Sequence, residues 1–216
     1  MNNINTIIWD WNGTLLNDVD VCIDAINILL QKRNIEQITK TLYKEIFTFP
    51  VIDYYKKVGF DFNKDSFDIL AVEFIDIYRE KLKSCNLFDD VKPILQKFNN
   101  NNYQQIILSA MQETDLTQSV IERGIKNYFQ HILGINNHFA NNKIGIALDY
   151  INKSNLQAGQ ACLIGDTIHD YEVAQKIGCK CILVDRGHQS RDRLLKTNVP
   201  VVKNLIEAES WLKDFK

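Results

Sequence analysis

Carboxylate side chains follow two apolar segments at the point where each predicted strand ends. The first strand, residues 6–11, brings Asp10 to its tip. A later strand, "ACLIG", is followed by Asp166, and Asp170 lies in the first turn of the next predicted helix. Clustered carboxylates repel one another unless a cation lies among them, and Mg²⁺ is the hard divalent ion that needs only one or two of them and keeps its waters. The spacing therefore predicts a magnesium site.

A hydroxyl, an ammonium group and a glycine turn complete this candidate site. Ser109 ends the predicted strand "QIILS", and Lys143 begins the predicted helix after "HILGI". Gly13 allows a turn sharp enough to bring backbone amides close to an anion. Together with Mg²⁺, these groups could neutralise a phosphoryl group during transfer and leave one carboxylate free to attack it. The chemistry indicated is phosphoryl transfer.

Strand-like and helix-like segments alternate from residue 104 onward, as in "QIILS", "TDLTQSVIERGI" and "HILGI". This alternation predicts an α/β fold, a Rossmann-like parallel sheet with helices on both faces, and the first strand is apolar enough to join the sheet. Ligands of open parallel sheets bind outside the carboxyl ends of the strands. We therefore expect the candidate residues to meet at one rim of the sheet.

Residues 18–90 have a different texture, because helical periodicity replaces the strand pattern. In "KDSFDILAVEFIDIYREKL" the apolar residues at three- and four-residue steps form one helix face: Phe67, Leu70, Ala71, Phe74, Tyr78 and Leu82. "VDVCIDAINILLQKRN" repeats the pattern, and Pro50 and Gly59 divide the remainder into shorter helices. We predict an α/β core of residues 1–17 and 91–216, interrupted by a helical domain of residues 18–90.

The overall composition indicates an ordinary globular protein. The 216 residues include 25 basic and 27 acidic side chains, a formal net charge of -2, which offers no general field to attract nucleic acid or an anionic membrane. No apolar segment approaches the roughly 20 residues that span a bilayer, and "MNNINT" lacks a signal-peptide pattern. With five cysteines that show no CxxC spacing, this predicts a cytoplasmic protein with reduced thiols.

Four short motifs, taken in order, resemble those of the haloacid dehalogenase superfamily of hydrolases. They are "DWNGT" at residues 10–14, "IILS" ending at Ser109, Lys143, and "GDTIHD" at residues 165–170. The helical segment between the first two motifs is similar to that superfamily's small helical cap, and "GHQS" at residues 187–190 resembles its phosphoglycolate-phosphatase-like branch. The resemblance implies a Mg²⁺-dependent phosphatase whose partner is a small phosphorylated metabolite, such as phosphoglycolate, a sugar phosphate or a nucleoside monophosphate.

The resemblance also implies roles for individual residues. Asp10 would be the nucleophile that forms an aspartyl-phosphate, a recognised form of carboxylate catalysis. Mg²⁺ would be held by Asp10, the carbonyl of Asn12, and Asp166. The phosphate would be bound by Gly13, Thr14, Ser109, Ala110 and Lys143. Thr167 and Asp170 would lie behind these groups, where Asp170 orients Lys143 or a metal-bound water.

One residue departs from the family pattern. Phosphatases of this superfamily usually carry a second aspartate two residues after the nucleophile, where it protonates the leaving alcohol and later activates water, whereas this chain has Asn12. A carboxamide exchanges no proton near neutral pH, so acid-base help of about 10²–10⁴-fold is missing at this position. Four explanations are open: an acidic leaving group, another residue such as His169 or His188, binding without turnover, or deamidation of the Asn12-Gly13 pair to aspartate.

The same departure leaves other functions open. The main alternative is a phosphate-compound binding or regulatory protein with little turnover. Haloacid dehalogenases need no Mg²⁺, and the presence of Asp166 and Asp170 argues against that activity. A phosphonate-cleaving relative forms a Schiff base with a cap lysine, for which Lys56 and Lys57 are candidates, although a lysine pair usually belongs to a solvated face.

Aromatic residues near Pro50 have two interpretations. They either line the substrate entrance or pack inside the helical domain: Phe47, Phe49, Tyr54 and Tyr55. His169 and His188 are expected at the surface or in hydrogen bonds.

Overall fold

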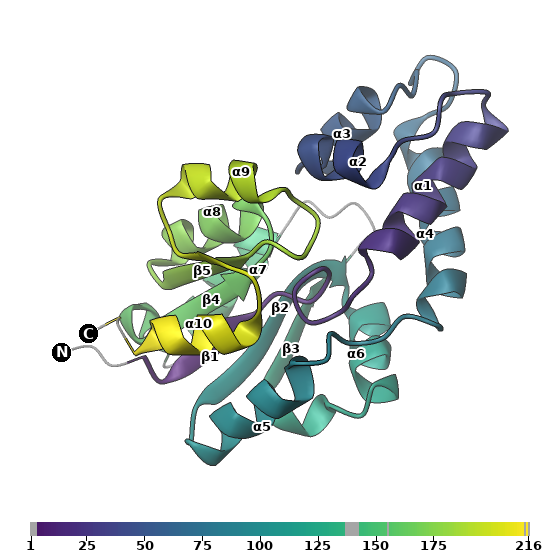
Figure 1. Ribbon diagram of the computed structural model, residues 1–216. Coiled ribbons are helices and arrows are strands. Elements are labelled where there is room, and N and C mark those ends of the chain that lie inside the picture. The colour runs from purple at the N-terminus through teal and green to yellow at the C-terminus, as the bar shows by residue number, and fades with distance from the viewer. Residues whose placement is uncertain (1–3, 137–142, 155, 214, 216) are drawn as a thin grey trace.

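The computed structural model describes residues 4–136, 143–154, 156–213 and 215 (Figure 1). The strands within these residues are β1 (Thr6–Trp9), β2 (Gln104–Gln112), β3 (His131–Ile135), β4 (Ala161–Gly165), β5 (Lys180–Val184) and β6 (Val201–Val202). They form one sheet in the order β3-β2-β1-β4-β5-β6, and every pairing in it is parallel. The predicted α/β fold with a Rossmann-like parallel sheet is confirmed.

The helices of the described residues alternate with these strands, except for four that follow β1. They are α1 (Val19–Lys32), α2 (Lys40–Ile46), α3 (Val51–Lys57), α4 (Phe67–Leu82), α5 (Val91–Asn100), α6 (Glu113–Glu122), α7 (Lys143–Lys153), α8 (Ile168–Ile177), α9 (Arg191–Leu194) and α10 (Leu205–Leu212), with short 3-10 turns η1 (Lys126–Tyr128), η2 (Ala158–Gln160) and η3 (Leu195–Thr197). None of the described helices has both the length and the apolar character needed to cross a bilayer.

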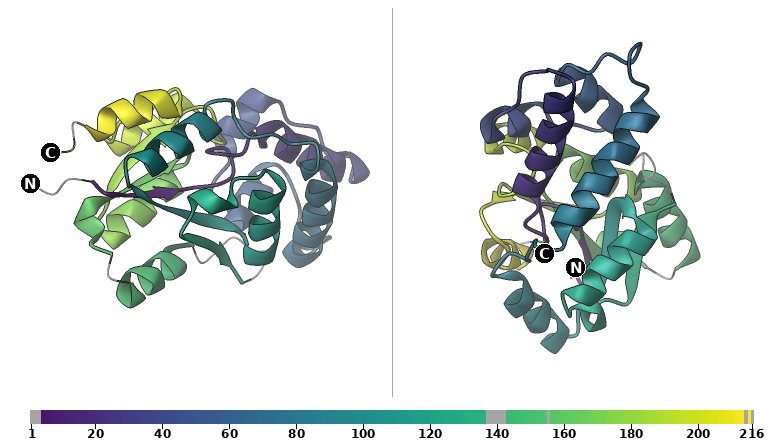
Figure 2. Two further views of the ribbon diagram at one scale, coloured as in Figure 1. Left: turned by 90° about the horizontal axis from the view of Figure 1, so that it is seen from below. Right: turned by 90° about the vertical axis from the view of Figure 1, so that its right-hand side faces the viewer.

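Helices cover both faces of the sheet (Figures 1 and 2). On one face, Ile7 and Trp9 of β1 belong to a core that includes α5, α6 and α10, and on the other face Ile8 packs with α7, α8 and α9. Successive side chains of a strand point to opposite faces, so a central strand with helices on both sides is apolar throughout. The strand ends are therefore the part of the sheet where polar side chains can gather.

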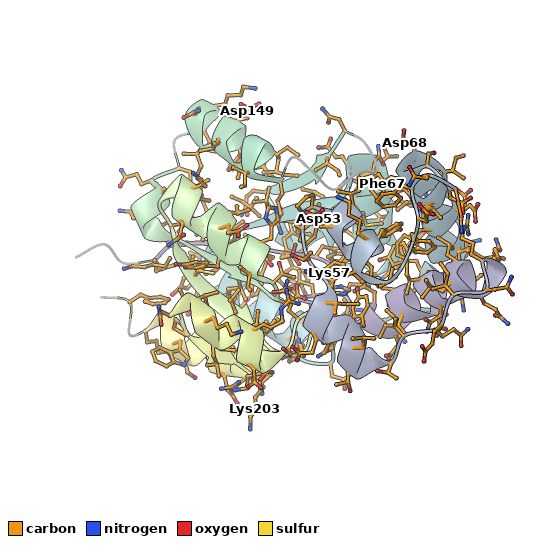
Figure 3. All side chains as sticks on the ribbon, turned by 90° about the horizontal axis from the view of Figure 1, so that it is seen from above. Asp53, Lys57, Phe67, Asp68, Asp149 and Lys203 are labelled. Carbon is orange, nitrogen blue, oxygen red and sulfur yellow. The ribbon has the colours of Figure 1, made fainter. Side chains whose placement is uncertain are left out.

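Helices α1 to α4 form a layer beyond the carboxyl ends of the strands (Figure 1). They have a hydrophobic cluster of their own, which includes Leu29 of α1, Tyr43 of α2, Tyr55 of α3 and Leu70 of α4. Asp68 of this layer lies far from Asp149 and Lys203, which project from opposite sides of the α/β part (Figure 3). The structure describes every residue from 18 to 90, and this segment contains four helices and no strand.

The structure differs from the sequence predictions at the ends of two strands and in one additional helix. β1 ends at Trp9 rather than at residue 11, because the chain turns where the amides of Leu15 and Leu16 donate to the Trp11 carbonyl at 3.0 and 2.9 Å. β2 continues past Ser109 to Gln112, with a shift of register against β3. Helix α5 was not among the predicted elements.

Candidate active site

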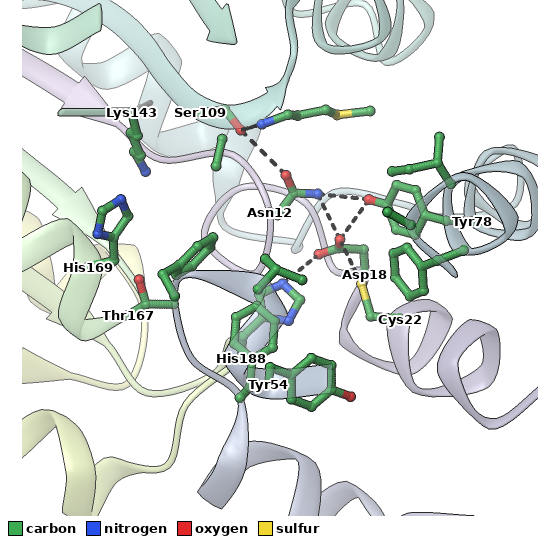
Figure 4. Close-up of a pocket in the computed structure, with 18 of the residues that line it drawn as sticks. Asn12, Asp18, Cys22, Tyr54, Tyr78, Ser109, Lys143, Thr167, His169 and His188 are labelled. Atoms are coloured by element: carbon green, nitrogen blue, oxygen red, sulfur yellow. Dashed lines mark hydrogen bonds and ion pairs between the residues drawn. The ribbon is translucent and has the colours of Figure 1, made fainter. Parts of the chain in front are cut away.

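Three polar side chains lie at the carboxyl rim of the central strands. Asp10 directly follows β1 and Asp166 directly follows β4. Ser109, which is labelled in Figure 4, lies in β2 within the segment where the pairing with β3 shifts. β1 lies between β2 and β4, and all three run in the same direction. The topology therefore brings together residues that are far apart in the sequence.

Lys143, the first residue of α7, is buried between two carboxylates. Its Nζ donates to Asp10 Oδ1 and, at 2.5 Å, to Asp170 Oδ1. Burial opposes the charge of the ammonium group, but the two carboxylates outweigh it and raise the pKa of Lys143. Burial also opposes ionisation of Asp170, yet Lys143 outweighs it and lowers the pKa of Asp170. Lys143 is therefore a fixed cation within the site.

Asp170 is held in place by the start of α8. Its Oδ2 accepts hydrogen bonds from Thr167 Oγ1 at 2.8 Å, from Thr167 N at 3.0 Å and from Asp166 N at 3.2 Å. A carboxylate is favoured in the first turn of a helix, where amides are free to donate. With Oδ2 occupied in this way, Oδ1 of Asp170 faces Lys143 and fixes the position of the ammonium group.

One hydroxyl lies between the two carboxylates that were predicted to hold the metal. Thr14 Oγ1 is 3.3 Å from Asp10 Oδ2 and 3.1 Å from Asp166 Oδ1. A hydroxyl has a single hydrogen to donate, so it satisfies one of these oxygens at a time. Burial is the main cause that raises the pKa of Asp10 well above its usual value and the pKa of Asp166 to about 6. Lys143 beside Asp10 and His188 near Asp166 thus offset only part of the cost of burying these two charges.

The donor set fits a divalent cation. Oxygens of Asp10, Asp166 and Asp170 lie within 4.8 Å of one another. Three buried carboxylates share one lysine there, so a cation beside Asp10 and Asp166 would offset the excess negative charge. All these donors are carboxylate oxygens, the ligands that Mg²⁺ prefers in proteins.

A pocket of about 160 Å³ opens above these groups. Most of the predicted site residues line it: Asp10, Asn12, Ser109, Ala110, Lys143, Asp166, Thr167 and Asp170. Gly13 and Thr14 are not among the lining residues; both are buried, and the Gly13 amide donates to Asp18 Oδ1 at 2.8 Å and to the Leu16 carbonyl at 2.9 Å. These two residues shape the turn behind the pocket.

Two glycines allow neighbouring loops to approach Asp166. A Cβ atom on Gly13, whose φ is +70°, would lie 2.4 Å from Asp166 Oδ2, and a Cβ atom on Gly187 would lie 2.0 Å from the same oxygen. The close approach lets the amide of His188 donate to Asp166 Oδ2 at 2.5 Å. The "GHQS" segment therefore fixes the orientation of a proposed metal ligand.

Replacing Gly187 with alanine should displace the Asp166 carboxylate. We expect phosphate release to fall about tenfold, because misplacement of reacting groups on the ångström scale is costly. Ser190→Ala is the matched control, since the buried Ser190 Oγ makes no hydrogen bond within the described structure. Steady-state kinetics and the melting temperature should be measured for both variants. Equal activity of Gly187→Ala and wild type would contradict this role of the glycine.

Asn12 belongs to a polar network with Asp18 and Tyr78, two residues whose sequence positions carry no signal of function (Figure 4). Asn12 Nδ2 donates to Asp18 Oδ2 at 2.8 Å and lies 2.7 Å from Tyr78 Oη, and Tyr78 Oη donates to Asp18 Oδ2 at 2.8 Å. A carboxylate directly before a helix is typical of a capping residue, but Asp18 makes no side-chain capping bond to α1. Its side chain holds Asn12 instead.

His188 joins this network from the other side. The imidazole Nδ1 lies 2.8 Å from Tyr43 Oη of α2, and Nε2 lies 3.4 Å from Asp18 Oδ1. Burial disfavours the imidazolium, but Asp18 outweighs it and raises the pKa of His188 to about 9. His188 is buried, so the expectation of a surface position is wrong and that of a hydrogen-bonded residue is confirmed. His169 lies against Glu172 at 3.2 Å and lines the pocket.

The same network bears on deamidation of Asn12. The reaction needs the Gly13 nitrogen to attack the Asn12 side chain, yet that amide donates to Asp18 and to the Leu16 carbonyl. The Asn12 amide is itself held by Asp18 and Tyr78. We therefore expect Asn12 to stay intact on storage of the folded protein, as measured by peptide mapping, with urea-unfolded protein as the control that deamidates. Aspartate appearing at position 12 at equal rates in both samples would contradict this.

Aromatic side chains of the helical layer form the far side of the pocket. This aromatic wall consists of Tyr43, Phe47, Phe49, Tyr54, Tyr55, Phe67, Phe74 and Tyr78. It includes all four aromatic residues for which the sequence leaves two interpretations, and both apply to Tyr54 and Tyr55, which line the pocket and are buried in the hydrophobic cluster of the helical layer. Lys56 and Lys57 are not among the described lining residues, and Lys56, which is 57% exposed, pairs with Asp53. This position does not favour Schiff-base chemistry.

Solved structures with the same fold are numerous. A predicted phosphatase from Clostridium acetobutylicum is 18% identical, with a TM-score of 0.80 over 98% of this chain and 99% of that chain. A predicted phosphoglycolate phosphatase from Haemophilus somnus 129PT is 18% identical, with a TM-score of 0.80 over 97% and 98%. Protein tyrosine kinase A of Mycobacterium tuberculosis is 18% identical, with a TM-score of 0.81 over 98% and 99%. At these identities the likeness concerns the fold.

The sequence itself carries a family signature. No curated protein matches the chain. The family of haloacid dehalogenase-like hydrolases, however, matches residues 7–184, a span that begins in β1 and ends with β5. The chain therefore belongs to the haloacid dehalogenase-like hydrolases.

Proposed function

We propose that this hydrolase is a Mg²⁺-dependent phosphatase that acts on small phosphomonoesters through an aspartyl-phosphate. The observation that supports it most is the position of Asp10, a buried carboxylate at the pocket floor whose two oxygens face Lys143 and Thr14. Solved structures of similar fold that are named as phosphatases add support. Residues 18–90 serve as a cap domain over a core of residues 1–17 and 91–216, because the aromatic wall closes the pocket from that side.

In the first proposed step, an oxygen of Asp10 attacks phosphorus. The phosphorus–oxygen bond to the leaving group breaks, its electron pair departs on that oxygen, and the product is an aspartyl-phosphate plus an alkoxide or phenolate that takes a proton from water. Ser109, the backbone at Ala110, and Lys143 hold the non-bridging phosphate oxygens. Lys143 suits this task because Asp170 fixes its ammonium group.

In the second step, water attacks the aspartyl-phosphate and releases inorganic phosphate, while Asp10 recovers its carboxylate and the proton of the water passes to solvent. Asp10, the Asn12 carbonyl and Asp166 would hold Mg²⁺, which when bound supplies neutralisation of the phosphate charge. Asn12 cannot act as the acid or base of either step. The substrate is a small phosphorylated metabolite rather than nucleic acid or membrane lipid, and five free cysteines favour a reducing compartment such as the cytoplasm.

Removal of divalent cations tests this proposal. Phosphate release from an aryl phosphate should fall about 10²-fold in EDTA and return on addition of Mg²⁺, because neutralising the phosphoryl group is worth several kcal/mol. Asp166→Asn should raise the Mg²⁺ concentration needed for half-maximal activity. Release that is indifferent to EDTA would contradict the proposed metal requirement.

The competing function, phosphate-compound binding with little turnover, is favoured by one observation. Asn12 occupies the position of the usual acid and is held by Asp18 and Tyr78. Calorimetry with inorganic phosphate and Mg²⁺ distinguishes the two functions. Binding without phosphate release from any phosphomonoester would support the binding protein.

A further inference from the structure

Every basic side chain that lines the described part of the pocket already faces an acid. Arg79 pairs with Asp115, and Lys143 pairs with Asp10 and Asp170. His169 pairs with Glu172, and His188 pairs with Asp18. The distance from Arg79 Nη2 to Asp115 Oδ2 is 2.6 Å. Lys143 lies beside the proposed phosphate position, so its charge is used there. A second anionic group of a substrate would thus have to compete with one of these acids for a cation of the described pocket, which lowers the affinity for such a substrate.

The other side of the pocket suits a flat apolar group. The aromatic wall includes T-shaped contacts of Phe47 with Phe49 and with Tyr54, at ring-centroid distances of 5.5 and 5.3 Å. Aromatic rings favour such edge-to-face arrangements with one another. The pocket volume of about 160 Å³ is close to the roughly 150 Å³ of an apolar cavity that binds benzene. Since the phosphate shares this volume, the space suits a group no larger than one ring.

The chemistry of Asn12 points to the same kind of leaving group by an independent route. Without an acid at this position, the leaving oxygen must depart as an anion, so the reaction depends on how acidic the alcohol is. A phenol has a pKa of about 10, as in tyrosine, whereas aliphatic alcohols are far weaker acids. A phenolate can leave unaided.

We infer, on the basis of the proposed function, that the substrates are monophosphates of small phenols that carry no second negative charge. The phosphate lies at Asp10 and Lys143, and the ring lies against the aromatic wall. Asp10 takes the phosphoryl group, the bond from phosphorus to the phenolic oxygen breaks, and the phenolate leaves with the electron pair and is protonated by water. Phosphoglycolate, with its carboxylate, is disfavoured.

Turnover of matched substrates tests this inference. With Mg²⁺ present, kcat/KM for phenyl phosphate should exceed that for cyclohexyl phosphate, which has the same carbon number and a less acidic alcohol, by about 10²-fold or more. The kcat/KM for phosphoglycolate should be equal to or lower than that for cyclohexyl phosphate. Phosphoglycolate turned over as well as phenyl phosphate would overturn the inference and leave the phosphatase standing. If no phosphomonoester is turned over, the proposed phosphatase function itself is contradicted.

Binding of phosphonates keeps the inference testable even without turnover. Benzylphosphonate should bind at least about tenfold more tightly than phosphonoacetate. The reason is that the basic side chains of the pocket are already paired with acids, so the carboxylate of phosphonoacetate finds no unpaired cation among them. Phe47→Leu, in the aromatic wall, should weaken benzylphosphonate about three- to tenfold. Phe62→Leu is the matched control, because Phe62 belongs to the same helical layer but is not among the pocket-lining residues.

One further variant should reverse the preference. Asp115→Asn leaves Arg79 without its acidic partner at the pocket wall, so phosphonoacetate should bind several-fold more tightly while benzylphosphonate binds as before. Phosphonoacetate binding the wild type as tightly as benzylphosphonate would overturn the inference, and so would a Phe47→Leu variant indistinguishable from Phe62→Leu.

Discussion

Replacing Asp10 with asparagine should reduce phosphate release by about 10⁴-fold or more, the scale on which removal of a covalent nucleophile acts. A carboxamide oxygen is too weak a nucleophile to form the acyl-phosphate. The fold should tolerate the change, because the variant keeps the side-chain volume and Lys143 retains Asp170 as its partner. Release from phenyl phosphate and the melting temperature are the two measurements.

The control for this variant is Asp149→Asn. Asp149 lies on α7, the helix that begins with Lys143, but its side chain is 74% exposed and its pairing with Lys153 at 3.8 Å is a surface contact of little energetic value. The activity of the Asp149→Asn variant should equal that of the wild type. Mass spectrometry of a rapidly quenched reaction should find one phosphoryl group on the peptide that contains Asp10. An Asp10→Asn variant that keeps a tenth of the activity would remove Asp10 from the role of nucleophile.

Much of the fold could be predicted because the core strands are apolar on both faces. Buried parallel strands read as continuous runs of isoleucine, leucine and valine, so β1 and β4 were recognised along with the carboxylates that follow them. The extension of β2 beyond Ser109 depends on an irregular pairing with β3, which no local pattern encodes. Helix α5 was missed, although its Pro93 lies in the first turn, where proline is tolerated.

The site was harder to predict, because its partners are set by tertiary contacts. Asp10, Asp166 and Asp170 could be proposed from their positions after strands and at the start of a helix. The link from Asn12 to Tyr78 joins residues 66 positions apart, and Tyr78 has the sequence pattern of a packing residue. His188 lies in a loop after β5, and only its approach to Asp166 and Asp18 shows that it is buried in the site.

Asn12→Asp, alone and combined with Asp18→Asn, tests whether the absence of an acid at position 12 limits the reaction. In Asn12→Asp, a new carboxylate would lie about as close to Asp18 as the 2.8 Å that now separates Asn12 Nδ2 from Asp18 Oδ2. Two such carboxylates cannot both ionise easily, so one of them takes up a proton. We expect a loss of about 1–3 kcal/mol in the free energy of unfolding, because a donor to Asp18 is also lost.

The double variant Asn12→Asp with Asp18→Asn should restore that pairing, since residue 18 becomes the donor and residue 12 the acceptor. It should be more stable than Asn12→Asp alone but less stable than the wild type, because the carboxylate beside His188 is lost. It should release phosphate from alkyl phosphates such as cyclohexyl phosphate about 10²–10⁴-fold faster than the wild type, because an acid stands beside the leaving oxygen. The gain should be much smaller for phenyl phosphate, whose leaving group needs no proton. Asp18→Asn alone adds no acid and should give no gain. A stable double variant that is slower than wild type on every substrate would mean that the Asn12 amide itself takes part in the reaction.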